Sequence, residues 1–269
     1  MSAGGERARD LLTYAALPVL LLTIWQLSVV SGLVREGLLP TPGEVGLTLL
    51  DLVFANSGAA GRYSGDWGDH AVASLLRVYA GFALAAVIAV PIGVGIGISR
   101  TFERVVDPTI QLLRNIPITG FVPVAIVLFG LGDRPAIYLI ALAAFFPTVV
   151  NTSYGVRQID QRIVRSALMM GAGPVQRLVR VILPAASPAI FTGLRLSLGI
   201  AWVLVVVTEF IGVRSGLGYL LFDAYQFFAP HVMLATMFSI GLLGFLSDRL
   251  LLLVRWRLLA WNRLGTLRG

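Results

Sequence analysis

Residues 74–98 read SLLRVYAGFALAAVIAVPIGVGIGI, and after Arg77 this stretch carries no charged side chain. A transmembrane helix needs about 20 mostly apolar residues to cross the hydrocarbon core of a bilayer. Further apolar stretches occur on both sides of this one, at residues 12–31, 116–131, 135–155, 186–213 and 232–254. The sequence therefore predicts an all-α polytopic membrane protein with six transmembrane helices.

The composition agrees with lipid as the main solvent of this chain. Hydrophobic residues make up 57% of the sequence and charged residues only 13%, whereas soluble domains carry roughly 25% charged residues. The apolar stretch 12–31 is longer than the roughly 7–15 apolar residues of a secretory signal peptide, so we expect it to remain as a span. We expect one transmembrane domain over residues 1–269, with core spans within 74–254 and no second soluble domain.

The chain is basic, with a net charge of +7, and all 21 basic residues are arginine. Nucleic acid is excluded as the partner because the arginines lie at the ends of apolar segments and not on one polar face. Arginine concentrates on the cytoplasmic side of membrane proteins. Six spans with both termini cytoplasmic place most arginines inside, namely Arg7, Arg9, Arg100, Arg104, Arg114, Arg157, Arg162, Arg165, Arg177, Arg180, Arg255, Arg257, Arg263 and Arg268.

The first connection outside the membrane, residues 33–73, contains a short helix signal. Thr41-Pro42-Gly43-Glu44 is typical of a capping box with proline at the first helical position. The apolar-rich stretch 45–54 after it predicts an amphipathic helix at the outer surface. Residues 56–58 and 61–68 are rich in glycine and are expected to form a flexible loop.

The connection between the fourth and fifth stretches, residues 157–184, contains RSALMMGAGPVQRLVRVILP at 165–184. A short helix over 163–168 is predicted, followed by turns at Gly171 and Gly173, where glycine supplies backbone conformations that other residues resist. Proline in the first helical turn then favours a second helix over 175–183. We expect Pro184 and Pro188 to stop that helix before the fifth span.

This segment resembles the cytoplasmic signature of ABC-importer permeases of the type I fold, which is Glu-Ala-Ala, three residues, Gly, nine residues and Ile-x-Leu-Pro. Val181 replaces the isoleucine, and Arg165 and Ser166 depart from Glu-Ala. The resemblance implies a coupling helix that docks on a separate ATPase, although an ordinary basic loop with buried methionines is the alternative. The coupling residues would be Arg165, Ser166, Ala167, Leu168, Met169, Met170, Gly171, Leu183 and Pro184.

Other segments extend the resemblance over about residues 40–255. They include 76–82 (LRVYAGF), 113–117 (LRNIP), 128–132 (LFGLG) and 216–219 (GLGY). These segments are similar to the branch of the family that takes up nitrate, sulfonate, taurine or bicarbonate, some members of which take aromatic acids or vitamin precursors.

The resemblance implies a homodimer in the bacterial inner membrane that works with two ATPase subunits and an extracytoplasmic solute-binding protein. A Walker A loop requires lysine, which this chain lacks, so ATP and Mg²⁺ would be bound by the partner ATPase and no cofactor by this chain. The expected function is passage of a small anion such as a sulfonate, taurine or nitrate. An ion-coupled secondary transporter and a polytopic membrane enzyme are the alternatives.

Polar and proline residues within the apolar stretches are candidates for the pathway or its gate. They are Asn115, Pro117, Thr119, Pro123, Pro147, Asn151, Arg195 and Glu209. Each has a structural alternative: a packing kink for Pro117 and Pro123, and hydrogen bonds between helices for Pro147 and Asn151. Arg195 could extend to the membrane interface or face an anionic solute, and Glu209 could gate or pair with Arg77 or Arg214.

No set of residues suited to catalysis or to metal binding is apparent in the sequence. His70 and His231 are the only histidines and lie in separate outer segments, and there is no cysteine. Gly93, Gly95 and Gly97 lack the third glycine of a nucleotide fingerprint. They are better explained as small residues that let helices approach closely.

Overall fold

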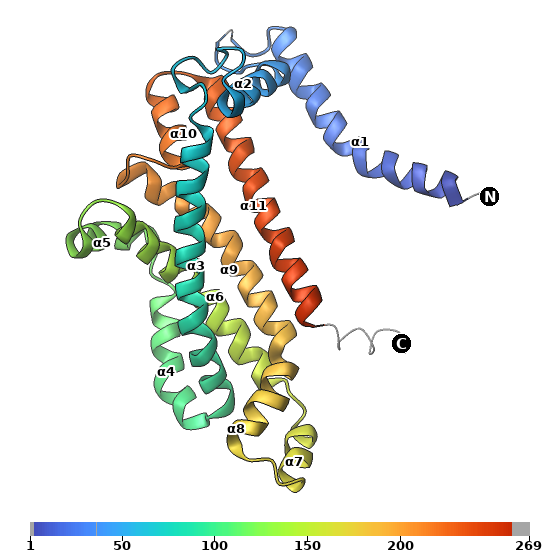
Figure 1. The fold of residues 1–269 in the computed structure, drawn as a ribbon, viewed down its shortest axis with the longest axis vertical. Coiled ribbons are helices and arrows are strands. Elements are labelled where there is room, and N and C mark those ends of the chain that lie inside the picture. The colour runs from blue at the N-terminus through green and yellow to red at the C-terminus, as the bar shows by residue number, and fades with distance from the viewer. Residues whose placement is uncertain (1–2, 36, 260–269) are drawn as a thin grey trace. The chain divides into compact units, whose positions relative to one another are not determined.

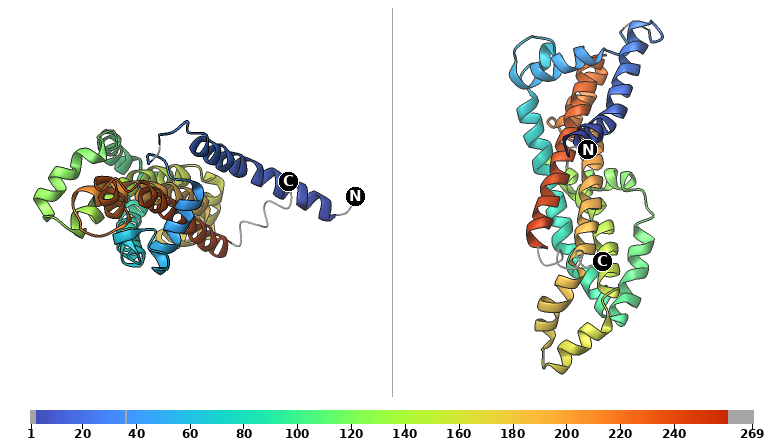
Figure 2. Two further views of the ribbon diagram at one scale, coloured as in Figure 1. Left: turned by 90° about the horizontal axis from the view of Figure 1, so that it is seen from above. Right: turned by 90° about the vertical axis from the view of Figure 1, so that its right-hand side faces the viewer.

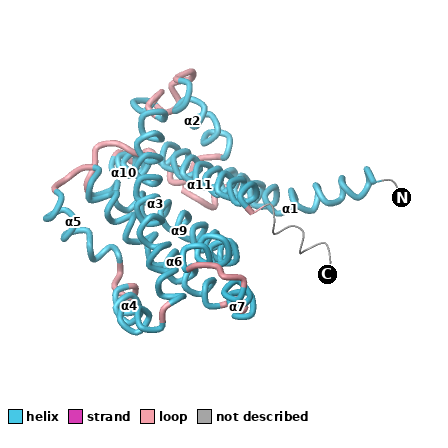
Figure 3. Tube along the Cα trace, turned by 60° about the horizontal axis from the view of Figure 1, so that its bottom comes forward, coloured by secondary structure: helices cyan, strands magenta, loops and turns pink. Residues whose placement is uncertain are grey.

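The computed structural model describes residues 3–35 and 37–259, with side chains described from residue 16 onward. Every regular element in these ranges is helical (Figures 1 and 3). The side chains of Arg7 and Arg9, together with Arg263 and Arg268, lie outside the described part. The α-helices are α1 (Ala3–Val30), α2 (Pro42–Phe54), α3 (Trp67–Ile98), α4 (Arg100–Leu113), α5 (Val122–Phe129), α6 (Asp133–Arg157), α7 (Gln161–Met169), α8 (Pro174–Arg177), α9 (Leu183–Ile211), α10 (Leu217–Gln226) and α11 (Pro230–Leu258).

Four helical segments of the described chain are long and apolar enough to cross a membrane: Trp67–Ile98, Asp133–Arg157, Pro174–Ile211 and Pro230–Leu258. They match the predicted second, fourth, fifth and sixth spans. Ala16–Val30 is a shorter apolar helix. The polytopic all-α fold is confirmed, while the count of six spans stays a prediction.

The predicted third span, 116–131, is not one kinked helix. The segments Arg100–Leu113 and Ile118–Phe129 are bent by 88° to each other. Pro117 precedes the short 3₁₀ helix Ile118–Phe121, and Pro123 lies in the first turn of α5. A proline at a helix start costs no hydrogen bond, and it disfavours helix in the residue before it. The two prolines therefore separate short helices, and the pair forms either one broken span or a re-entrant loop.

The contacts divide the chain into two compact units. Unit 1 contains residues up to 70 together with 220–239, and unit 2 contains 71–219 and the chain from 240 onward. The helices α3, α10 and α11 each have residues in both units. Each unit is described below by itself.

In unit 1 the predicted capping box is confirmed, and α2 begins after Thr41. The backbone N–H of Glu44 donates to Thr41 Oγ1 at 3.2 Å, and the N–H of Thr41 donates to the Glu44 carboxylate at 2.8 Å. The expected glycine-rich loop follows α2, and hydrogen bonds fasten its first part. Asp51, which is fully buried, accepts backbone N–H groups from Ser57, Gly58 and Ala60 at 2.7–2.9 Å.

Asp51 is therefore the cap that orders residues 57–60. The N–H of Ala60 and those of Ser57 and Gly58 favour the charged carboxylate and lower the pKa of Asp51 to about 2, despite its burial. A lowered pKa contributes stability at pH values above the ordinary aspartate pKa, and this contribution is lost as the pH falls through the folded value.

We expect Asp51→Ala to loosen residues 57–60 at neutral pH, because three backbone donors lose their acceptor. Limited proteolysis, or amide hydrogen exchange at 57–60, checks this. Asp51→Asn is the matched control, since it keeps one acceptor oxygen and should give an intermediate exchange rate. Equal exchange in all three proteins would contradict the role of Asp51.

A second polar cluster in unit 1 joins the loop after α2 to α10. Asp223 pairs with Arg62 and accepts the hydroxyl of Tyr63 at 2.8 Å. Burial, together with the neighbouring Asp223 carboxylate, raises the pKa of Tyr63 to about 12. The Arg62 guanidinium also lies 3.7 Å from the ring centroid of Phe227, a cation–π arrangement.

Unit 2 is built on α6 and α9, which run side by side (Figure 1), and on a small-residue face of α3. Gly81, Ala85, Ala89, Gly93 and Gly97 recur every fourth residue on α3 and are turned toward α6 or buried. A Cβ added at Gly93 would lie 2.6 Å from Thr152 Cβ. Small residues at this spacing allow helix backbones to approach closely, as the sequence predicts for Gly93 and Gly97.

The expectation that Pro184 and Pro188 end a helix is wrong. Helix continues from Pro174 to Ile211, through a π-helical turn at Leu178–Ile182 that leads into α9. Pro188 removes the amide that would bond the Pro184 carbonyl, and the Ser187 hydroxyl donates to that carbonyl instead at 2.7 Å. The Ser187 hydroxyl thus replaces the hydrogen bond that Pro188 removes, and the wider π turn lets the helix continue past Pro184.

Candidate functional site

The connection between α6 and α9 forms a helix–turn–helix segment, here called the elbow (161–182), which lies at one end of unit 2 (Figure 2). After α7 the chain turns at Gly171, whose φ is +80°. The N–H of Gly171 donates to the Leu168 carbonyl and the N–H of Ala172 to the Ala167 carbonyl, both at 3.0 Å. This bonding pattern is a Schellman cap, which places a left-handed residue, usually glycine, after the helix.

The elbow exposes apolar side chains while its base is anchored. Met169 and Met170 are 80% and 81% exposed, and Leu168 is also exposed, whereas Ala167 is buried. Ile182 packs in one core cluster with Val156 at the end of α6, and Leu183 packs against that cluster. The tip is therefore open to contact with another protein, while the base is packed against the end of α6. Arg165 and Ser166 are exposed on α7, and Pro184 lies in the first turn of α9.

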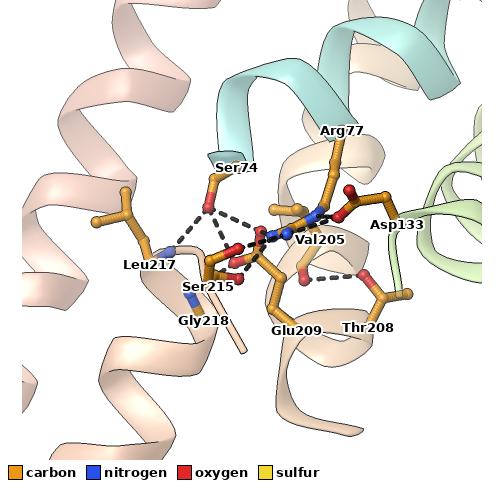
Figure 4. A network of polar contacts seen from close by, with 9 residues as sticks. All are labelled: Ser74, Arg77, Asp133, Val205, Thr208, Glu209, Ser215, Leu217 and Gly218. Atoms are coloured by element: carbon orange, nitrogen blue, oxygen red, sulfur yellow. Dashed lines mark hydrogen bonds and ion pairs between the residues drawn. The ribbon is translucent and has the colours of Figure 1, made fainter. Parts of the chain in front are cut away.

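A buried ionic cluster, here called the Glu209 cluster, lies at the other end of α9 in unit 2. Glu209 is fully buried and accepts Arg77 Nη1 at 2.6 Å, which is one of the two pairings that the sequence left open, and its role as a gate stays a prediction. It also accepts the Ser74 hydroxyl at 2.8 Å and the backbone N–H of Gly218 at 2.8 Å. Asp133 at the start of α6 accepts Arg77 Nε at 2.8 Å. Figure 4 shows these side chains converging from α3, α6 and α9.

Arg77 uses its whole guanidinium in this cluster. Nη1 also donates to the Ser215 carbonyl at 2.7 Å, and Nη2 donates to the Ser215 hydroxyl at 2.8 Å and reaches Asp133 at 2.7 Å. A guanidinium has five N–H donors, and four of them donate to Asp133, Glu209 and Ser215. Arg77 therefore joins three segments of unit 2.

The segment 212–219 rests directly on Glu209. Gly216 has φ +115°, and a Cβ there would collide with the Glu209 carboxylate. A Cβ at Gly218 would lie 2.9 Å from Glu209 Cβ and from the backbone of Val206. The two glycines of the sequence GLGY at 216–219 are thus explained by close approach of backbone to a buried charge.

The candidate residues around the third stretch gather at the break between α4 and α5. Asn115, Pro117, Thr119 and Pro123 are all exposed there, and the Asn115 amide donates to the Gln111 carbonyl at 2.6 Å. Their exposure fits both a pathway wall and a simple turn. Their role in the pathway stays a prediction.

Polar residues in α6 bond mainly to helix backbone and to α9. The Thr148 and Ser197 hydroxyls lie 2.6 Å apart, and Ser197 donates to the Ala144 carbonyl at 2.7 Å. The Asn151 amide donates to the Pro147 carbonyl at 2.8 Å, and Gly193 of α9 packs against Asn151. The bond of Asn151 to Pro147 lies within α6, whereas Thr148 and Ser197 bond between helices, so the role of Pro147 and Asn151 in the pathway stays a prediction.

Arg195 forms an ion pair with Asp248. Its Nε and Nη2 donate to the two carboxylate oxygens of Asp248 on α11 at 2.6 and 2.8 Å. Sequence reasoning named neither Asp248 nor Asp133, Ser74 and Ser215, because each lies far along the chain from its partner. The signal available was the rule that a charge within a span requires a partner of opposite sign, and Asp248 interrupts the last apolar stretch.

Comparison with known proteins identifies the family to which this chain is similar. Residues 81–259 match the family described as binding-protein-dependent transport system inner membrane component. The chain is 37% identical over 246 residues to a putative aliphatic sulfonates transport permease protein of Bacillus subtilis, covering 91% of this chain and 86% of that protein. It is 34% identical over 242 residues to the taurine transport system permease protein of Escherichia coli, covering 90% and 86%. A bicarbonate transport system permease protein of Synechococcus elongatus is 38% identical over 189 residues, covering 69% and 67%.

A solved structure has the same fold. The methionine ABC transporter MetNI in an inward-facing conformation contains a chain that matches 68% of this one over 93% of its own length, with a TM-score of 0.57 and 20% identity. That similarity establishes the fold alone. With the family match and relatives above 30% identity over most of the chain, we conclude that this protein belongs to the binding-protein-dependent transport inner membrane components, the permease subunits of ABC transporters.

Proposed function

We propose that the chain forms a homodimeric permease for a small anion, with two ATPase subunits bound at the elbows and a solute-binding protein at the opposite face. The relatives named above are transporters of aliphatic sulfonates, taurine and bicarbonate. All three classes of solute are small and carry an acidic oxygen group. A sulfonate or a chemically similar anion is therefore the proposed solute.

The proposed orientation has both termini and the elbow in the cytoplasm. Arg157, Arg162, Arg165, Arg177 and Arg180 all lie in or beside the elbow, and arginine marks the cytoplasmic side of membrane proteins. The localisation that follows is the bacterial inner membrane. ATP and Mg²⁺ would be bound by the ATPase, because this chain has no lysine for a Walker A loop.

The observation that carries this function is the exposed apolar tip of a rigidly based elbow. Methionine is flexible and polarisable, and exposed methionines suit a protein-binding surface. When the ATPase subunits close, a docked tip moves with them and carries α6 and α9 as rigid bodies. Alternating access then follows from a shift between two conformations.

We expect the double substitution Met169→Asp, Met170→Asp to reduce ATP-driven uptake more than ten-fold, because two carboxylates would enter an apolar contact without partners. The measurement is uptake of taurine and of bicarbonate by proteoliposomes that contain the permease, its ATPase and the binding protein. Met169→Leu, Met170→Leu is the matched control and should retain uptake, since this swap conserves apolar volume.

Two results would overturn the proposal. The first is normal uptake by the aspartate variant in the assembled complex. The second is uptake by the purified chain without ATPase, driven by an ion gradient, which would identify a secondary transporter instead.

A further inference from the structure

The ion pair between Arg195 and Asp248 differs from the Glu209 cluster in its exposure. Both oxygens of Asp248 accept from the Arg195 fork, at 2.6 and 2.8 Å. The Arg195 side chain is nevertheless 51% exposed and that of Asp248 is 28% exposed, whereas Glu209 is fully buried. The pair therefore lies open on the surface of unit 2.

The position of Arg195 along its helix places this open pair deep in the membrane. At a rise of 1.5 Å per residue, Arg195 is about 21 Å from Glu209 and about 22 Å from Arg180 along one helix. The hydrocarbon core of a bilayer is about 30 Å thick. Wherever that core is placed between Arg180 and Glu209, Arg195 lies at least about 8 Å inside it.

An exposed charged pair at that depth does not face lipid tails. Charged side chains within spans face the bundle interior or a water-filled cavity. Thr192 and Gly199 lie three residues before and four residues after Arg195, so they share its face of α9. Both are exposed, and a Cβ added at Gly199 would meet no atom within 4 Å. The face is thus open and unfilled by the rest of unit 2. Arg195 and Thr192 supply its polar groups, and the exposed side chains of Leu196 and Val203 lie beside them.

We propose that this face of α9 lines the aqueous pathway and that Arg195 attracts the acidic group of the transported anion, while Asp248 holds the guanidinium when no anion is present. This inference rests on the proposed function. A guanidinium fork binds planar oxygen pairs and other oxyanions through two parallel N–H donors. The anion exchanges with Asp248 for those donors. Such competition keeps the attraction weak, which a transport pathway requires if the solute is to leave.

The absence of cysteine from the chain allows a direct test. Gly199→Cys introduces a single thiol one helical turn from Arg195, at a position with open space. We would measure its rate of reaction with two methanethiosulfonate reagents, one bearing a sulfonate and one bearing a trimethylammonium group. The sample is the complex with its ATPase and binding protein in proteoliposomes. Val87→Cys on α3, a position 72% exposed among apolar neighbours, is the control.

The Gly199→Cys variant should react with both reagents, and the Val87→Cys variant with neither. Adding Arg195→Gln should lower the sulfonate-to-trimethylammonium rate ratio about five-fold, and adding Asp248→Asn should raise it about five-fold. This is the effect of one unit charge at roughly 8 Å on two reagents of opposite charge in a medium close to bulk water, about 0.5 kcal/mol for each reagent. Opposite shifts would show that the two charges act on the solute path with opposite sign.

Two outcomes would overturn the inference. An unreactive Gly199→Cys variant would mean that lipid or the second copy covers this face. If Arg195→Gln and Asp248→Asn instead shifted the rate ratio equally and in the same direction, the pair would only fasten α9 to α11. Because the thiol assay needs no solute, it still reports on this face if the complex fails to take up taurine or bicarbonate, a failure that would count against the proposed function.

Discussion

Replacement of Arg77 by alanine is expected to destabilise the protein by about 3–5 kcal/mol, the range for breaking a buried ion pair by removal of one partner. Glu209 would remain fully buried with only the Ser74 hydroxyl and the Gly218 N–H as donors. Ser215 would lose both of its bonds to the guanidinium. Segment 212–219 would then keep the bond from the Leu217 N–H to the Ser74 hydroxyl at 2.8 Å, but would lose its two bonds from Ser215 to α3.

The measurement is thermal unfolding of the detergent-purified chain, followed by the loss of monodisperse protein in size-exclusion chromatography. Arg134→Ala is the matched control, because Arg134 is an exposed neighbour of Asp133, and exposed substitutions usually change stability by less than about 0.5 kcal/mol. Arg77→Lys should fall between the two, since an ammonium retains the charge but lacks the five-donor fork. If Arg77→Ala unfolds at the temperature of the native chain, the ionic cluster does not hold this end of unit 2.

Local signals in the sequence predicted local structure well. Thr41 and Glu44 form the predicted capping box because the pattern involves only residues within one turn. Gly171 has the backbone conformation that other residues resist, as expected, whereas the same expectation is wrong for Gly173, whose backbone is extended. The positions of the long apolar helices followed from bilayer thickness alone.

Sequence reasoning failed where a distant or unrecognised group satisfies the backbone or a charge. Pro188 does not stop α9, because Ser187 supplies the missing donor and a π turn precedes the helix. Pro117 lies between two helices, where proline costs no backbone hydrogen bond, and not inside one continuous helix. The pairing of Arg195 with Asp248 joins residues 53 positions apart. Helical periodicity carries no information about a contact across that separation.

The substitution Gly171→Val is expected to abolish most ATP-driven uptake while leaving the membrane-spanning part folded. A non-glycine residue held in a sparsely populated backbone region costs about 1–3 kcal/mol, a factor of about 5 to 150 in the population of the native turn. A β-branched side chain raises the cost further. The elbow would relieve this strain by opening its Schellman cap, which reorients Met169 and Met170. A Cβ at Gly171 meets no atom within 4 Å, so the strain remains local to the turn.

Gly173→Val is the matched control for that experiment. Gly173 also has open space around its Cβ position, but its φ of −65° and ψ of 168° are accessible to any residue. Uptake by the Gly173→Val variant should therefore stay close to that of the native chain. Gly171→Asn tests conformation against size, because asparagine tolerates the left-handed region, and it should retain more uptake than Gly171→Val. Uptake by proteoliposomes and thermal unfolding are measured for all three variants. Equal uptake by Gly171→Val and Gly173→Val would contradict the argument, because the turn geometry would then be irrelevant to coupling.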